Sequence, residues 1–140
     1  MKVTKEMLQK ILKDWRVVAY DDDGSFDVSQ HSPEGEEIVM SLQGETLEDM
    51  AHFVEEYRRD YDAGDHAAQI YHAKHYGSAD EQRFFASAPE SLEDLLKDAK
   101  AIDKMYQSLA KKLMSAAKRL AKKAGKEGKV KNGKKKTQKV

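Results

Sequence analysis

The stretch that decides the fold is residues 91–125, SLEDLLKDAKAIDKMYQSLAKKLMSAAKRLAKKAG. Its apolar residues recur in alternating steps of three and four, which is the spacing of one face of an α-helix. Ser91 followed three residues later by Asp94 is typical of a helix N-terminus. The sequence therefore predicts one helix that ends near Ala124, roughly 50 Å long at 1.5 Å per residue. Its apolar seam consists of Leu92, Leu95, Ala99, Ile102, Tyr106, Leu109, Leu113, Ala116 and Leu120.

A helix of this length is too long for one small sheet to cover. We expect its first half to pack in the body of the protein, and its second half to project or to pair with another copy. Leu113, Ala116 and Leu120 continue the apolar seam past the expected body. A regular three-four repeat favours helix pairing, so the sequence predicts a homodimer through the distal part of this helix.

The residues before the long helix predict small elements for it to cover. Thr4 can cap a short helix, in which Met7, Leu8, Ile11 and Leu12 recur at helical spacing. Three β-like runs follow over residues 15–20, 26–28 and 37–42. Short turns join them, so we expect a three-stranded antiparallel meander. The turns are Asp21-Asp22-Asp23-Gly24 and Ser32-Pro33-Glu34-Gly35.

Two further helices are predicted between the meander and the long helix. The first follows Thr46, and its apolar residues Leu47, Met50, Val54, Tyr57 and Tyr61 all lie on one side. Asp62-Ala63-Gly64-Asp65 should end it. The second is expected over residues 66–76, with Gly77 as a left-handed cap. Residues 77–90, which include Phe84 and Phe85, are expected to form a loop or a short helical turn. The predicted fold class is α+β.

The charge is divided unevenly along the chain, although the net charge is zero. Residues 1–110 carry 12 Lys/Arg and 24 Asp/Glu, which gives −12, whereas residues 111–140 carry 13 Lys/Arg and one Glu, which gives +12. Almost nothing after Gly125 is apolar, so these residues cannot bury surface to offset their ordering entropy. We therefore predict a single domain over residues 1–125 and a disordered Lys-rich arm over residues 126–140.

The basic end offers candidate nucleic-acid-binding residues, because a basic patch releases counterions when it meets phosphates. The distal helix is also amphipathic, which leaves binding to a membrane surface open. A solvated tail, or one that contacts the acidic body, is the third interpretation. The candidate residues are Lys118, Arg119, Lys122, Lys123, Lys134, Lys135 and Lys136.

Acidic residues gather on and around the helix that follows Thr46, opposite its apolar side. Carboxylates spread along a helix can imitate a row of phosphates and occupy a nucleic-acid-binding groove on another protein. A hydrated helix face is the alternative interpretation, and it is the commoner case. The candidate partner-binding residues are Glu45, Glu48, Asp49, Glu55, Glu56, Asp60, Asp62 and Asp65.

The sequence predicts neither a metal nor a cofactor. Zinc needs three or four converging ligands, and the run His72-Ala73-Lys74-His75 lacks the His-Glu-x-x-His signature. An EF-hand loop around Gly24 would need acids at the positions of Ala19 and Gln30. The side chains weighed for zinc are His66, His72, His75, Asp62 and Asp65.

The sequence also argues against several classes of protein. It has no cysteine, which removes disulfides and a cysteine nucleophile and fits a reducing cytosol. Glycine-rich phosphate loops and nucleophile elbows are absent, so we predict that the protein is not an enzyme. No signal peptide or membrane-spanning segment is evident, and we expect a cytoplasmic location.

Several stretches within residues 15–110 resemble small accessory proteins carried by phages and integrative elements of Gram-positive gut bacteria. Most such proteins have no assigned function, so the resemblance identifies no functional residues. It implies an anti-defence role in the bacterial host, including inhibition of CRISPR systems. The Lys-rich arm is not part of the resemblance. The stretches are Phe26-Asp27-Val28-Ser29, Ser32-Pro33-Glu34-Gly35-Glu36, Thr46-Leu47-Glu48, residues 62–66 and residues 92–102.

Two functions follow as hypotheses. The leading one is a non-catalytic protein of a mobile element that binds and inhibits a host nucleic-acid-handling complex, such as a CRISPR effector. Its partner would be a host protein or ribonucleoprotein. The alternative is a DNA- or RNA-binding accessory protein that acts through the basic arm without sequence specificity, since lysines greatly outnumber arginines there.

Overall fold

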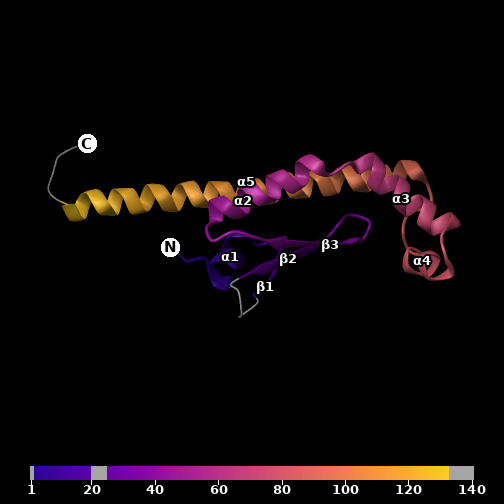
Figure 1. The fold of residues 1–140 in the computed structure, drawn as a ribbon, viewed down its shortest axis with the longest axis horizontal. Coiled ribbons are helices and arrows are strands. Elements are labelled where there is room, and N and C mark those ends of the chain that lie inside the picture. Colours follow the sequence, from indigo (N-terminus) through magenta and orange to yellow (C-terminus); the bar gives the residue numbers. More distant parts are fainter. Residues whose placement is uncertain (1, 20–24, 133–140) are drawn as a thin grey trace.

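The computed structural model describes residues 2–19 and 25–132, with side chains described as far as Ala124. The protein is α+β, as the sequence predicts, and α5 runs along the whole molecule (Figure 1). In chain order the elements are α1 (Lys5–Ile11), β1 (Arg16–Ala19), β2 (Phe26–His31), β3 (Glu37–Leu42), α2 (Leu47–Asp60), α3 (Ala63–Tyr76), α4 (Ala79–Phe84) and α5 (Leu92–Asn132).

The three strands form the predicted antiparallel meander in the order β1-β2-β3. Val17 on β1 pairs with Val28 on β2, which in turn pairs with Met40 on β3. These side chains are buried on one face, whereas their neighbours in sequence are less buried, as the two-residue period of a strand requires. The predicted turn at Asp21–Gly24 lies outside the described residues.

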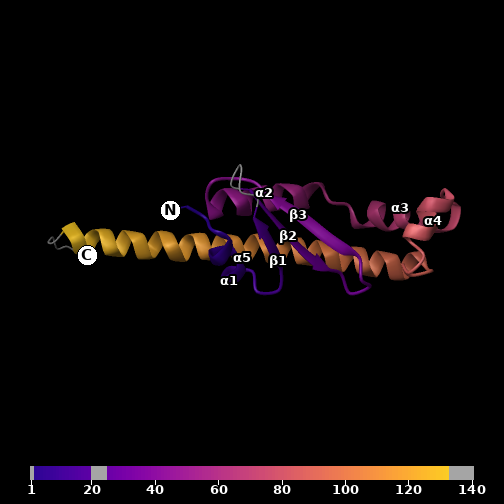
Figure 2. The same ribbon diagram turned by 90° about the horizontal axis from the view of Figure 1, so that it is seen from below.

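The main hydrophobic core lies between the sheet, α2 and the middle of α5, and Figure 2 shows the sheet and α2 along that part of α5. Ile102 and Leu109 are almost fully buried there, together with Val28 and Val54. Tyr106 makes edge-to-face ring contacts with Tyr57 of α2 and with Tyr61, which caps the end of α2, each with centroids 5.4 Å apart. Tyr106 is buried, and burial of an aromatic ring contributes strongly to packing.

The body covers more of α5 than the sequence predicts. Leu113 and Ala116 are fully buried in the main core, and Leu120 is partly buried against it. The expectation that the seam leaves the body at these residues is therefore wrong, because α1 also packs on α5 and its residue Leu8 belongs to the same core. The argument for a homodimer through this seam loses its basis, since one chain already covers the seam.

The helix α5 is also longer than predicted, because it continues through Gly125 to Asn132. A glycine costs a helix about 1 kcal/mol relative to alanine but does not stop it as proline does. Residues 133–140 of the predicted arm lie outside the described residues.

The junction between α2 and α3 differs in detail from the prediction. α3 begins at Ala63 rather than at His66, because Asp62 caps it by accepting the Asp65 N–H at 3.0 Å. Gly77 is not a left-handed cap, since its φ is −79°. A Cβ at Gly77 would instead lie 2.6 Å from the carbonyl oxygen of Ala73, so this glycine permits a close backbone approach.

Candidate functional site

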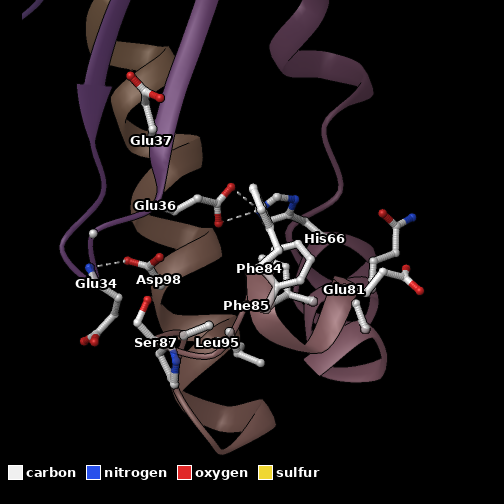
Figure 3. Close-up of a pocket in the computed structure, with 16 residues that line it drawn as sticks. Glu34, Glu36, Glu37, His66, Glu81, Phe84, Phe85, Ser87, Leu95 and Asp98 are labelled. Carbon is white, nitrogen blue, oxygen red and sulfur yellow. Dashed lines mark hydrogen bonds and ion pairs between the residues drawn. The ribbon is translucent and has the colours of Figure 1, made fainter. Parts of the chain in front are cut away.

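A cavity of about 570 Å³ lies where the β2–β3 turn, α3, α4 and the beginning of α5 meet (Figure 3). Its floor is apolar and includes Ile70 and Leu95, and its acidic side chains come from the turn, α4 and α5. These residues are up to 64 positions apart in the sequence, so only the packing of α3 and α5 against the turn brings them together. The acidic side chains are Glu34, Glu36, Glu37, Glu81 and Asp98.

Asp98 holds the β2–β3 turn in place on α5. It is only 6% exposed, and its two oxygens accept hydrogen bonds from the Ser32 hydroxyl at 2.8 Å and from the Glu34 backbone N–H at 3.1 Å. The Ser32 hydroxyl oxygen in turn accepts the backbone N–H of Glu36 at 3.0 Å. Hydrogen bonds to a carboxylate offset its desolvation, so this buried charge positions the turn that forms one wall of the cavity.

Glu36 and His66 connect the turn to α3. His66 Nε2 lies 3.1 and 3.0 Å from the two carboxylate oxygens of Glu36, as the dashed lines in Figure 3 mark. This hydrogen bond raises the pKa of the His66 imidazole above its usual value, although partial burial opposes the shift. The ring centroids of Tyr61 and His66 are 5.6 Å apart. The Tyr61 hydroxyl donates a hydrogen bond to the Ala99 carbonyl at 3.1 Å. The pKa of the Tyr61 phenol is raised, chiefly because the side chain is partly buried.

Two consecutive aromatic residues form the outer wall of the cavity. Phe84 is 79% exposed and contacts Phe85 edge to face, with ring centroids 4.8 Å apart. Phe85 packs against a second, smaller core that contains Ile70 and Leu95. α4 places this pair, because the Ser78 hydroxyl accepts the Glu81 N–H at 3.2 Å while the Glu81 carboxylate accepts the Ser78 N–H at 2.9 Å.

Several polar groups around the cavity are already paired within the protein. Ser87 supplies a hydroxyl, but among the described residues no hydrogen bond joins it to His66. His66 and Glu36 are hydrogen-bonded to one another, and Asp98 already accepts two hydrogen bonds. The site therefore offers an apolar, aromatic surface bordered by negative charge.

The predicted acidic face lies elsewhere, on the side of α2 that points away from the core and at the beginning of α3. Most of its carboxylates are exposed. Glu55 is half-buried, and its carboxylate lies 3.4 Å from the Arg58 guanidinium. Glu48 lies 3.7 Å from His52, and Asp65 accepts from the Gln69 amide at 3.0 Å. None of the acidic-face residues lines the cavity. They are Glu45, Glu48, Asp49, Glu55, Glu56, Asp60, Asp62 and Asp65.

The predicted basic residues that the structure describes lie on the distal part of α5, far along the helix from the cavity. Lys118, Arg119, Lys122 and Lys123 are all exposed. Lys118 and Lys122 lie on the side of the helix opposite Leu113 and Leu120, and Arg119 and Lys123 lie on its flank. Lys134, Lys135 and Lys136 lie outside the described residues.

The histidines considered for zinc lie in separate contacts. His66 pairs with Glu36, the His75 Nε2 is 3.0 Å from the Glu90 carbonyl oxygen, and the His72 ring lies 5.7 Å from that of Tyr76. Over residues 2–19 and 25–132, no three side chains of histidine, aspartate or glutamate converge in a way that could hold a metal ion.

Sequence reasoning missed the cavity, although two local signals were present. Ser78 followed by Glu81 is a capping box, and it precedes two adjacent phenylalanines that a solvated loop has no reason to carry. No pattern indicated that residues 34–37 would lie against α3 and α5.

Comparisons with protein families, with curated proteins and with solved structures found no match for this chain. In the part of the chain that the structure describes, no helix is long and apolar enough to cross a membrane.

Proposed function

We propose that this protein is a non-catalytic inhibitor that binds the basic nucleic-acid-binding surface of a host complex. The observation that carries the proposal is the acidic face of α2, whose side chains are directed to solvent while the opposite side of the helix is buried. Exposed carboxylates with few local cations leave a negative potential that attracts basic partners.

The spacing of the charges supports mimicry of a phosphate row. Glu48 to Asp60 spans twelve residues, or about 18 Å at 1.5 Å per residue. Five carboxylates of the acidic face lie along this span, with a mean separation along the axis of about 4.5 Å, which is of the same order as the ~3.4 Å between phosphates along one DNA strand. Arg59 lies on the same side and reduces the net charge. The five are Glu48, Asp49, Glu55, Glu56 and Asp60.

An RNA-guided nuclease of a CRISPR system is the complex we propose. Such effectors hold nucleic acid in a positively charged channel and recognise its backbone rather than its sequence. A rigid helix with an acidic face could occupy such a channel. The resemblance to accessory proteins of mobile elements favours the same class of target.

The test is a competition between this protein and labelled nucleic acid for a purified RNA-guided nuclease. We expect the full chain to displace the nucleic acid, and the variant Glu48→Gln/Glu56→Gln/Asp60→Asn to do so at least about tenfold less well, since three charges of the interface are lost. The control Glu34→Gln/Glu37→Gln/Glu93→Gln removes three exposed charges elsewhere and should compete like the unchanged protein. Equal loss in both variants, or no displacement at low salt, would refute the proposal.

A second candidate function rests on the exposed basic side of distal α5. Four cations there, Lys118, Arg119, Lys122 and Lys123, could neutralise phosphates directly. This candidate predicts binding to unrelated duplexes that weakens steeply with salt. It also predicts loss of that binding when these four cations are replaced by glutamine, and a further loss when the chain is truncated after Gly125. An inhibitor acting through α2 keeps most of its activity in both variants.

A further inference from the structure

The cavity between the β2–β3 turn, α3, α4 and α5 is suited to a lysine-rich segment. Among the described residues, five carboxylates and one imidazole are its titratable side chains, and neither Lys nor Arg lines it. Glu36 is paired with His66, but Glu34 and Glu37 are exposed and direct their carboxylates outward (Figure 3). A cation beside the turn, at the border of the cavity, can therefore pair with carboxylates that have no ion-pair partner among the described residues.

Lysine matches the remaining walls as well. Its four-carbon stem can lie on apolar surface while the ammonium stays at the charged rim. The exposed ring of Phe84 stands at the cavity and can receive a cation on its face. The densest run of lysines in the chain is Lys134-Lys135-Lys136.

The geometry of α5 prevents this run from reaching the cavity of its own chain. Asp98 lines the cavity and α5 continues to Asn132, so the helix carries the chain about 51 Å away at 1.5 Å per residue. Residues 133–140 can return at most about 28 Å even when fully extended. Figure 1 shows α4 and the C-terminal end of α5 at opposite ends of the molecule.

We propose that the cavity of one copy binds the lysine-rich residues 133–140 of a second copy. In an antiparallel pair, each α5 carries its basic end to the cavity of the other chain, so the contact is made twice and the assembly closes. This contact does not use the acidic face of α2 and is independent of the proposed inhibition.

Sedimentation of the full chain over a range of concentrations at low and at moderate salt tests the proposal. We expect a reversible dimer at low salt that weakens as salt is raised, because exposed ion pairs are screened. Lys134→Gln/Lys135→Gln/Lys136→Gln, or Glu34→Gln/Glu37→Gln, should each weaken dimerisation by about tenfold or more, since several ion pairs are lost twice.

Matched controls separate this contact from general charge effects. One control removes three lysines from α5, as many as the lysine 134–136 variant loses: Lys118→Gln/Lys122→Gln/Lys123→Gln. The other removes two carboxylates from α2, as many as the Glu34/Glu37 variant loses: Glu48→Gln/Glu56→Gln. Both controls should dimerise normally. Mixing the lysine 134–136 variant with the Glu34/Glu37 variant should partly restore association, because one intact contact forms. All substituted side chains that the structure describes are exposed, and thermal unfolding verifies that each variant folds.

Three results would overturn the proposal. A monomer at every concentration at low salt would show that no such contact forms. Association that the lysine 134–136 variant leaves unchanged would place the interface elsewhere. Equal weakening by the controls would show that net charge alone, and not the cavity, drives association. Competition with the nuclease is measured separately, so neither failure implies the other.

Discussion

The middle and the beginning of α5 are packed in different ways. Among the described residues, the sheet, α1, α2 and the middle of α5 share a core of twenty buried residues. At the beginning of α5, the second core has four buried residues in the described part of the chain, Leu95 and Ala99 of α5 and Ala67 and Ile70 of α3, with partly buried side chains such as Phe85 packed against them. A small core costs less to open than a large one. The cavity thus lies in the part of the molecule that can adjust most easily to a bound segment.

The largest expected effect is in the main core. Leu109 is completely buried on α5, so Leu109→Asp places a charge where no partner exists and should cost several kcal/mol, about 4 or more. We expect the whole domain to unfold or to lose most of its thermal stability, measured by circular dichroism. Ser108→Asp changes the exposed neighbour on the same helix and should cost little. Similar melting of both variants would contradict the assigned face.

A smaller and more local effect is expected in the second core. Leu95→Ala should cost about 2–3 kcal/mol through lost burial and a residual cavity. Hydrogen exchange should quicken over α3 and α4 while the amides of the sheet keep their protection. The control is Leu92→Ala, because Leu92 is largely exposed one turn earlier. Uniformly faster exchange would show that the two cores open as one unit.

The smallest expected effect is the dependence of stability on pH that the His66–Glu36 pair causes. The hydrogen bond to Glu36 raises the pKa of His66 in the folded state. The pair therefore stabilises the fold fully below the unfolded value of about 6.5, and this contribution is lost as pH rises through the folded value. Partial exposure limits it to under about 1 kcal/mol.

Urea unfolding at pH 5.5 and at pH 9 measures this contribution. His66→Gln and Glu36→Gln should each reduce the difference in unfolding free energy between the two pH values by a similar amount, since either change removes the pair. An undiminished difference in His66→Gln would mean that another group causes the pH dependence.

Much of the fold could be predicted, because its signals are local. The spacing of apolar residues identified α5 and α2, and the alternation of apolar and polar residues within short runs identified the strands of the meander. Thr4 and Thr46 cap α1 and α2 as expected. Helix ends were less predictable. α3 begins three residues before the predicted start, because the Asp62 side chain accepts a backbone N–H there. Gly77 is needed for a close approach to the Ala73 carbonyl and not for a left-handed turn.

The candidate site could not be predicted, because no single segment of the sequence indicates that a cavity forms there. Glu36 and His66 are 30 positions apart, and Ser32 and Asp98 are 66 apart. Each side chain has an ordinary local interpretation as a turn acid, a surface histidine or a helix carboxylate. Only the packed structure shows that Asp98 is buried and that it holds the turn against α3.

The sequence by itself determined most of the elements, the division of charge and the buried sides of α2 and α5, because these depend on residues within a few turns of one another. The tertiary structure alone decided how far the body extends along α5 and where the cavity forms. Leu113 and Ala116 carry the same seam pattern as Leu109, and their burial depends on α1, which is about a hundred residues away in the chain. Contacts between such distant segments follow from packing, and no local pattern of residues encodes them.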